Sequence, residues 1–425
     1  MKRTFLKTKK ISVLLTLILL TLIFAVSLTI QAQPGTGWQA SKETVEKLSK
    51  SRPEFNYYEE KVPAFTLPSA LTSVNGKTIS AKDDWMKIRR PELLELFRSN
   101  VFGRISSTPY KMDFKIVNQD SKAINGSATL KQVDITITAE DKSLVIHLNL
   151  FVPNNIPKPV PAFLLINLGS RNIDPARKEK SESWPVEEMI ARGYAAAAFS
   201  NADIDPDNFD EFKNGIHGVL DKGTRTDDAW GTLAAWGWGA SRCMDYFVSD
   251  KDIAKDKVAV VGHSRGGKTA LWAGAEDQRF AMVVANESGA GGAAIARRRL
   301  GETVARLNTS FPHWFSTNYR KYNSNEDTLP VDTHELLALI APRALYIDCA
   351  SEDLWGDPKG CYLALYNSLP VFRLLGIKSE LPEAVPPLDK QVISGKVAFH
   401  IRSGEHGLKL QDWNFFMDFA DKVMK

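Results

Sequence analysis

The sequence predicts an α/β fold built around a mostly parallel sheet. The main observation is a series of short, continuous apolar runs between helical segments: AFLLINLG, YAAAAFS, KVAVVGHS, RFAMVVANES, RALYIDCAS and KVAFHIRSG. Runs without polar alternation are typical of parallel strands that helices cover on both faces. Earlier in the chain, MDFKIV, SATLKQVDITIT and SLVIHLNLFVP alternate in part between apolar and polar residues. This alternation favours antiparallel strands at the N-terminal edge of the sheet.

The chain begins with a predicted targeting segment. The basic stretch MKRTFLKTKK is followed by the apolar run ISVLLTLILLTLIFAVSLTI and by a small residue, Ala32. This order predicts a secretory signal peptide over residues 1–32, or an N-terminal membrane anchor if the segment stays uncleaved. We therefore expect an exported protein, secreted or periplasmic. The chain has 54 Lys and Arg, five of them in this segment, against 50 Asp and Glu, so no basic surface for a nucleic acid is expected.

Residues 33–110 are expected to wrap around the α/β domain of residues 111–425, with 33–425 as one structural unit. Within this segment, DDWMKIRRPELLELFRSNVFG predicts a helix whose main body opens at Arg90-Pro91, because proline is tolerated in a first helical turn. The three cysteines, Cys243, Cys349 and Cys361, fit no zinc spacing, and we expect buried free thiols.

The stretch GHSRGGKTALWAG, residues 262–274, fits two catalytic patterns. As G-x-S-x-G it is a nucleophile elbow that presents Ser264, and as G-x-x-x-x-G-K-T it is a phosphate-binding loop that presents Lys268. Both need a strand that runs into a helix, which this stretch supplies. The elbow is favoured because an exported protein meets little nucleotide, and because several strands precede Ser264. The elbow further requires an acid and then a histidine later in the chain.

His406 meets the requirement for a late histidine. It lies in HIRSGEHGL, after the last predicted strand and before the final helix, LQDWNFFMDFADKVMK. His400 lies within that strand and His263 within the elbow, so structural roles are favoured for both. Two carboxylates, Glu287 in NESGAGG and Asp353 in CASEDLWGDP, follow successive strands after the elbow. Either could fix the histidine tautomer and stabilise the imidazolium, and the spacing does not choose between them.

Several of these motifs together resemble the glucuronoyl esterases, family 15 of the carbohydrate esterases. GHSRGGKTALWAG is followed by NESGAGG, with Glu287 placed 23 residues after the serine. The stretches RRPELLELFRSNVFG, AWGTLAAWGWGASRCMDYF, LNTSFPHWFSTNY and SGEHG are also similar to the family, so the resemblance covers most of the mature chain. It implies an α/β-hydrolase fold and a carboxylic ester hydrolase that cleaves esters between glucuronic acid on xylan and lignin alcohols. It also implies a monomer that requires no metal or organic cofactor.

The resemblance implies roles for the catalytic candidates. Ser264 would be the nucleophile and His406 the base, while Arg265 would supply an oxyanion N–H and a cationic side chain. Glu287 matches the acid position of fungal members, and Asp353 matches a later acid of some bacterial members. We expect the two acids to share the role, with Glu287 slightly favoured.

The resemblance also implies three substrate-binding residues. Lys268, one helical turn after the serine, would donate to sugar hydroxyls. Glu302 and Trp355 would hold the uronic acid, Glu302 by accepting hydrogen bonds and Trp355 by ring contact and its indole N–H. For the tryptophans of the AWGTLAAWGWG stretch, Trp230, Trp236 and Trp238, the spacing favours a core helix without a role in the site.

The expected partner is glucuronoxylan or a lignin-carbohydrate ester, with no nucleic acid and no membrane beyond the possible N-terminal anchor. The nearest alternative is an acetyl xylan esterase or another exported serine carboxylesterase. From another class, the chain could be a catalytically inactive hydrolase fold that binds glycans.

Overall fold

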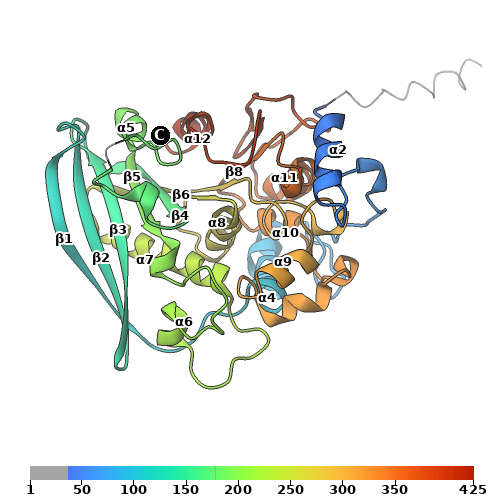
Figure 1. Ribbon diagram of the computed structural model, residues 1–425, viewed down its shortest axis with the longest axis horizontal. Coiled ribbons are helices and arrows are strands. Elements are labelled where there is room, and N and C mark those ends of the chain that lie inside the picture. The colour runs from blue at the N-terminus through green and yellow to red at the C-terminus, as the bar shows by residue number, and fades with distance from the viewer. Residues whose placement is uncertain (1–36, 178) are drawn as a thin grey trace, which may run out of the picture. The chain divides into compact units, whose positions relative to one another are not determined.

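A computed structural model describes residues 37–177 and 179–425 (Figure 1). The predicted signal peptide, residues 1–32, lies outside the described residues. Residues 39–425 form one compact unit. Among the helices that the structure describes, none combines the length and the apolar character needed to cross a bilayer.

A single mixed sheet of ten strands organises this unit, in the order β1-β2-β3-β5-β4-β6-β7-β8-β10-β9. The three N-terminal strands are antiparallel and lie at one edge, as the sequence predicts: β1 (Lys111–Ala123), β2 (Ala128–Ala139) and β3 (Lys142–Pro153). Six strands pair in parallel from β5 to β10: β4 (Val160–Asn167), β5 (Ala195–Ser200), β6 (Ile253–His263), β7 (Met282–Asn286), β8 (Ala344–Ala350) and β10 (Val397–Arg402). The predicted α/β class with a mostly parallel sheet is confirmed.

One strand was not predicted. β9 (Val392–Ser394) pairs antiparallel with β10 and closes the far edge of the sheet. It has only three residues and follows the proline-rich stretch ELPEAVPPLD, so its sequence carries no strand pattern.

Helices cover both faces of the parallel strands, which explains why these strands lack polar alternation. Figure 1 shows α5 and α12 over one face and α7 and α8 over the other. α12 fills its face with large apolar side chains, among them Trp413 and Phe416, which pack in one cluster with residues of β4, β5 and β6. The α-helices beyond residue 180 are α5 (Val186–Ala191), α6 (Gly215–Leu220), α7 (Thr232–Ser249), α8 (Arg265–Glu276), α9 (Val304–Ser310), α10 (Thr333–Ala338), α11 (Pro358–Leu374) and α12 (Leu410–Val423).

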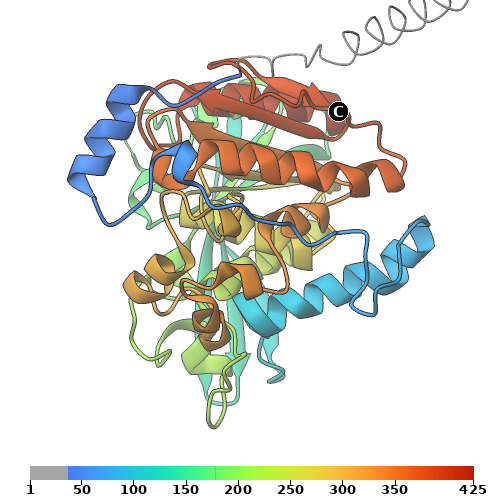
Figure 2. The same ribbon diagram turned by 90° about the vertical axis from the view of Figure 1, so that its right-hand side faces the viewer.

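The helical region before the sheet runs from Lys82 to Phe102, over the stretch in which the sequence predicts a helix. α4 (Arg90–Phe97) begins at the predicted Arg90-Pro91, but α3 (Lys82–Asp84) and a π-helical turn (Trp85–Arg89) precede it without a break. Proline has no N–H to donate, and a widened turn is one way in which a continuous helix tolerates the lost bond. This light-blue helix lies at the end of the N-terminal segment, which starts with α2 (Lys42–Ser51) (Figure 2).

The predicted core residues are buried. Trp236 and Trp238 lie on α7 with at most 6% of their surface exposed, as the core interpretation predicts. Trp230 is also buried, but it lies before the start of α7 and belongs to the preceding loop. All three cysteines are free and buried, which confirms the prediction for them.

Candidate active site

Ser264 sits in a sharp turn between β6 and α8. Its φ of 57° and ψ of −124° lie in a region that non-glycine residues rarely occupy, and such strain collects at functional sites. A side chain at Gly262 would meet the carbonyl oxygen of Gly266 at 1.9 Å, so glycine is required there. The backbone N–H of Ser264 donates to Asn286 O at 2.9 Å, which ties the turn to β7. The turn therefore has the geometry of a nucleophile elbow.

Glu287 and Asp353 approach the same ring nitrogen of His406. The Oε2 of Glu287 lies 2.9 Å from His406 Nδ1, and the Oδ2 of Asp353 lies 2.7 Å from the same atom. Glu287 directly follows β7 with a φ of 47°, and Asp353 lies just beyond the end of β8. The carboxyl ends of neighbouring parallel strands meet at one edge of the sheet, which is why acids so far apart in sequence converge.

The two acids have different surroundings. The Glu287 side chain is fully buried, and it also accepts hydrogen bonds from Arg402 at 2.8 Å and from the Gly407 N–H at 2.7 Å. The Asp353 side chain is 10% exposed, and the described residues give it no cationic partner other than His406. Burial raises the pKa of Glu287, and His406 opposes that rise.

His406 is exposed on the side away from the acids. Its side chain is 42% exposed, and both acids contact Nδ1, so that in the described part of the chain Nε2 has no hydrogen-bond partner. The centroid of its ring lies 4.5 Å from the ring centroid of His263, the residue just before Ser264. Burial lowers the pKa of His406, but Asp353 and Glu287 outweigh burial and raise the pKa above its ordinary value. Burial, together with the charge of His406, lowers the pKa of His263 to about 4.

Arg265, the residue after the serine, is held by a side chain that the sequence interpretation missed. Its Nε donates to Asp207 at 2.5 Å, and Asp207 also accepts from Trp314 Nε1 at 2.8 Å and contacts His313 Nε2 at 3.1 Å. Burial raises the pKa of Asp207, but the hydrogen bonds with His313 and Trp314 lower it and hold it below its ordinary value. A carboxylate in the loop beyond β5 was the available signal, because that loop lies at the same sheet edge as Ser264.

The three proposed substrate-binding residues are linked to one another. Lys268 is buried, and its Nζ donates to the Ser288 carbonyl at 2.7 Å and to Glu302 Oε2 at 3.3 Å. The Glu302 N–H donates to the carbonyl of Trp355 at 3.0 Å. Trp355 is partly exposed and lies in the 3-10 turn η9 (Leu354–Gly356), directly after Asp353. Lys268 is therefore not a surface lysine.

Arg402 is a second residue that the sequence interpretation missed. Besides Glu287, its guanidinium contacts Asp412 at 3.2 Å and donates to three carbonyls of the His406 loop. These carbonyls belong to Ser403, Glu405 and Gly407, at 3.0, 2.9 and 2.9 Å. The signal in the sequence was an arginine at the end of a mostly apolar strand, since a buried charge requires partners.

Two groups of histidine and acid side chains are close enough together to hold a metal ion. They are His263, Glu287 and His406, and the fully buried Asp348, His400 and Asp412. In each group one carboxylate is already bound by Arg402, Glu287 in the first and Asp412 in the second. A cation placed there would be repelled by the guanidinium, so neither donor set suits a metal.

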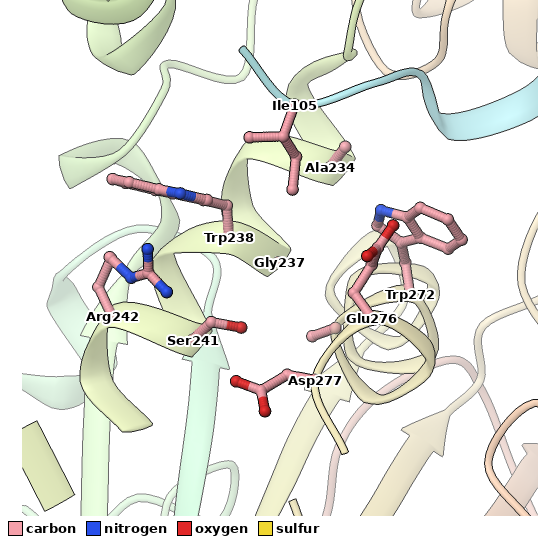
Figure 3. A pocket seen from close by; sticks show the side chains of 10 residues that line it. Ile105, Ala234, Gly237, Trp238, Ser241, Arg242, Trp272, Glu276 and Asp277 are labelled. Atoms are coloured by element: carbon pink, nitrogen blue, oxygen red, sulfur yellow. The ribbon is translucent and has the colours of Figure 1, made fainter. Parts of the chain in front are cut away.

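A cavity of about 210 Å³ lies away from these residues, between α7 and the C-terminal end of α8. Figure 3 shows Trp238 and Arg242 of α7 facing Trp272 and Glu276 of α8 across it. Ser264 stands at the opposite end of α8, a helix about 18 Å long. Glu276 is already bound to Arg98, and Trp272 is only 1% exposed, so the cavity offers neither a free acid nor an open ring.

Comparisons with known proteins show what the chain resembles. The family model described as glucuronyl esterase, fungi, matches residues 135–376. A carbohydrate esterase, MZ0003, from an unknown prokaryotic organism is 38% identical over 401 residues, which are 87% of this chain and 92% of that protein. The 4-O-methyl-glucuronoyl methylesterase 1 of Wolfiporia cocos is 35% identical over 327 residues, 73% of this chain and 72% of that protein. A solved glucuronoyl esterase from Solibacter usitatus superposes with a TM-score of 0.81 at 38% identity, covering 87% of this chain and 100% of that one.

Proposed function

Because the chain belongs to the glucuronoyl esterases, family 15 of the carbohydrate esterases, we propose that it hydrolyses esters of 4-O-methyl-glucuronic or glucuronic acid through a Ser-His-acid mechanism. The chain is a carboxylic ester hydrolase with the α/β-hydrolase fold. What is proposed is which residues perform the reaction and which substrate is the natural one.

The observation that supports this mechanism most directly is the arrangement around His406. Glu287 and Asp353 hold its Nδ1 at 2.9 and 2.7 Å, while Nε2 has no partner in the described part of the chain. A general base needs one nitrogen fixed by a carboxylate and the other left free for the proton of the nucleophile. The adjacent elbow presents Ser264 at the end of β6.

The reaction proceeds in two acyl-transfer steps. His406 takes the hydroxyl proton of Ser264 as its oxygen attacks the C6 carbonyl of the uronate, and the alcohol leaves with that proton. Water, activated by the same histidine, then cleaves the acyl-enzyme and releases glucuronate and free Ser264. Arg265 stabilises the oxyanion with its backbone N–H and its cationic side chain, and such a donor contributes about 10²- to 10³-fold in rate.

Lys268, Glu302 and Trp355 hold the sugar. Of the three N–H groups on Lys268 Nζ, one is used by the Ser288 carbonyl and one points to Glu302, which leaves a third for a sugar hydroxyl. Glu302 accepts from a hydroxyl, and the Trp355 ring packs on the apolar face of the sugar.

We further propose that residues 1–32 export the enzyme and that its natural substrate is the ester link between glucuronoxylan and lignin alcohols. Export fits this substrate, because a cross-linked polysaccharide cannot enter the cell. The acid on the sugar is the acyl group of such a link, which distinguishes it from the acetyl esters of xylan.

The test is hydrolysis of benzyl and methyl glucuronate by the purified protein, with 4-nitrophenyl acetate and acetylated xylan run alongside. We expect activity on the glucuronate esters to dominate and to disappear in Ser264→Ala. Activity on acetyl esters alone would retain the serine mechanism and overturn the substrate. Full activity in Ser264→Ala would overturn the mechanism.

A further inference from the structure

The N-terminal segment reaches the proposed sugar site directly after α2. None of the residues of this helix is fully buried, and the helix ends at Ser51, followed by Arg52 and Pro53. Proline just beyond a C-cap prevents the helix from continuing. Figure 2 shows α2 in blue at the edge of the described unit, near α11. α2 itself has no fully buried residue, and the residues that follow it add contacts to the proposed sugar site.

Two side chains of this stretch contact Trp355. The guanidinium carbon of Arg52 lies 4.4 Å from the centroid of the indole ring, a cation–π distance. The ring of Phe55 meets the indole edge to face, with centroids 4.7 Å apart and an angle of 89°. Trp355 is thus contacted by two residues about 300 positions earlier in the sequence.

The backbone of the same stretch is hydrogen-bonded to Gly301, the residue before Glu302. The carbonyl of Asn56 accepts a hydrogen bond from Gly301 N at 2.8 Å, and the next residue, Glu302, donates its N–H to the Trp355 carbonyl at 3.0 Å. Gly301 has a φ of +68°, and a side chain there would meet the Trp355 carbonyl oxygen at 2.5 Å. The three chain segments therefore pack without space between them.

Tyr57 lies in the same stretch, directly after Asn56. It is 2% exposed, and burial raises its pKa. The charges of Arg52 and Asp353 act on the same phenol in opposite directions, Arg52 lowering its pKa and Asp353 raising it. The stretch of residues 52–57 thus borders the proposed sugar contacts Trp355 and Glu302.

We propose that Arg52 and Phe55 are positioning residues for substrate recognition, which hold the Trp355 ring in the orientation that contacts the uronic acid. This inference rests on the role proposed above for Trp355. It extends sugar recognition to a stretch that lies outside residues 135–376, the part matched by the family model. Without these contacts the Trp355 ring would sample several orientations. Only the fraction in the binding orientation could contact the sugar, so the affinity would fall.

The test separates binding from chemistry. In Arg52→Ala and Phe55→Ala we expect KM for benzyl glucuronate to rise about fivefold, the size of a partly exposed cation–π or aromatic contact, with kcat within about twofold. Hydrolysis of 4-nitrophenyl acetate, which has no sugar to contact Trp355, is expected to stay unchanged. Lys61→Ala is the matched control, because Lys61 makes the same type of contact on the same segment, 4.1 Å from the ring of Tyr58.

Trp355→Ala, alone and combined with Arg52→Ala, distinguishes a failure of this inference from a failure of the role proposed for Trp355. If Arg52 acts through the indole, its replacement adds nothing once Trp355 is gone. A raised KM in Trp355→Ala with an unchanged KM in Arg52→Ala and Phe55→Ala overturns this inference and leaves the proposed function intact. Additive effects would also overturn it, since Arg52 would then contact the sugar by itself. An unchanged KM in Trp355→Ala would instead overturn the proposed role of Trp355.

Discussion

Two histidines only six residues apart, His400 and His406, each contact a carboxylate, but they use their rings differently. His400 lies inside β10 and is fully buried; its Nε2 contacts Asp412 at 3.0 Å and its Nδ1 contacts the Tyr346 hydroxyl at 3.0 Å. His406 lies in the loop beyond β10, where its side chain is 42% exposed and both acids meet at Nδ1. His400 therefore has no nitrogen left for a substrate, whereas His406 keeps Nε2.

The charges around the two rings differ as well. Burial lowers the pKa of His400 even though Asp412 opposes it, and Asp412 also shares its charge with Arg402. For His406, two carboxylates outweigh burial and raise the pKa. A histidine next to an acid is thus a common structural pair. It becomes a candidate base only where the outer nitrogen is accessible and the charge of the acid is not fully used elsewhere.

Replacing each histidine by glutamine gives the largest expected difference. His406→Gln is expected to lower kcat on benzyl glucuronate by about 10⁴- to 10⁶-fold, the range for loss of a base that acts with a nucleophile, with little change in unfolding temperature. His400→Gln is expected to retain kcat within a few-fold and to lose about 1–3 kcal/mol of stability, because Asp412 and Tyr346 lose a buried partner. Steady-state kinetics and thermal unfolding measure both. Equal loss of kcat in the two variants would contradict the distinction between His406 as the base and His400 as a structural residue.

The two acids of His406 can be separated next. We expect Asp353→Asn and Glu287→Gln each to lower kcat by about 10- to 100-fold, and the double variant to approach the roughly 10⁴-fold loss of a histidine without any carboxylate. Glu287→Gln is also expected to lower the unfolding temperature, because the buried guanidinium of Arg402 loses part of its countercharge. A single variant as inactive as the double variant would mean that one acid alone serves His406.

The pH dependence tests the charge argument. The active form carries neutral His406, so kcat/KM rises with pH through the pKa of this group. Asp353 contributes to the raised pKa of His406. Asp353→Asn is therefore expected to move the rising limb of the kcat/KM–pH profile to lower pH, by about one unit for the loss of an adjacent charge. His400→Gln is the control and is expected to leave the limb in place. A limb that moves to higher pH in Asp353→Asn would contradict the assignment.

Much of the fold could be predicted because each buried strand leaves a local pattern. The six parallel strands appear as continuous apolar runs, whereas β9, with three residues, is too short to carry one. The residues around Ser264 could be nominated for a related reason, since Glu287, Asp353 and His406 each follow the end of a parallel strand. Their roles remain predictions.

The supporting residues could not be found in this way. Arg402 contacts Glu287 across 115 positions, Asp207 contacts Arg265 across 58, and Arg52 reaches Trp355 from before the sheet begins. No periodicity or motif in a single sequence records such contacts, because they depend on how distant loops meet. For Arg402 the sequence offers a charged residue in a buried strand, where burial would demand a partner. Arg52 is exposed and carries no such signal.

Arg402 connects the two histidine–acid pairs, so a conservative change there has the smallest expected effect and gives the finest comparison. Arg402→Lys keeps the positive charge near Glu287 and Asp412 but loses the planar fork that contacts both acids and three loop carbonyls. We expect kcat to fall about two- to fivefold through looser placement of the His406 loop, with the pH limb nearly unchanged because the charge remains. Arg402→Gln removes the charge, and the loss of this nearby cation favours protonated His406, so the limb should move to higher pH. If Arg402→Lys moved the limb as far as Arg402→Gln, the guanidinium would act on His406 by its geometry and not by its charge.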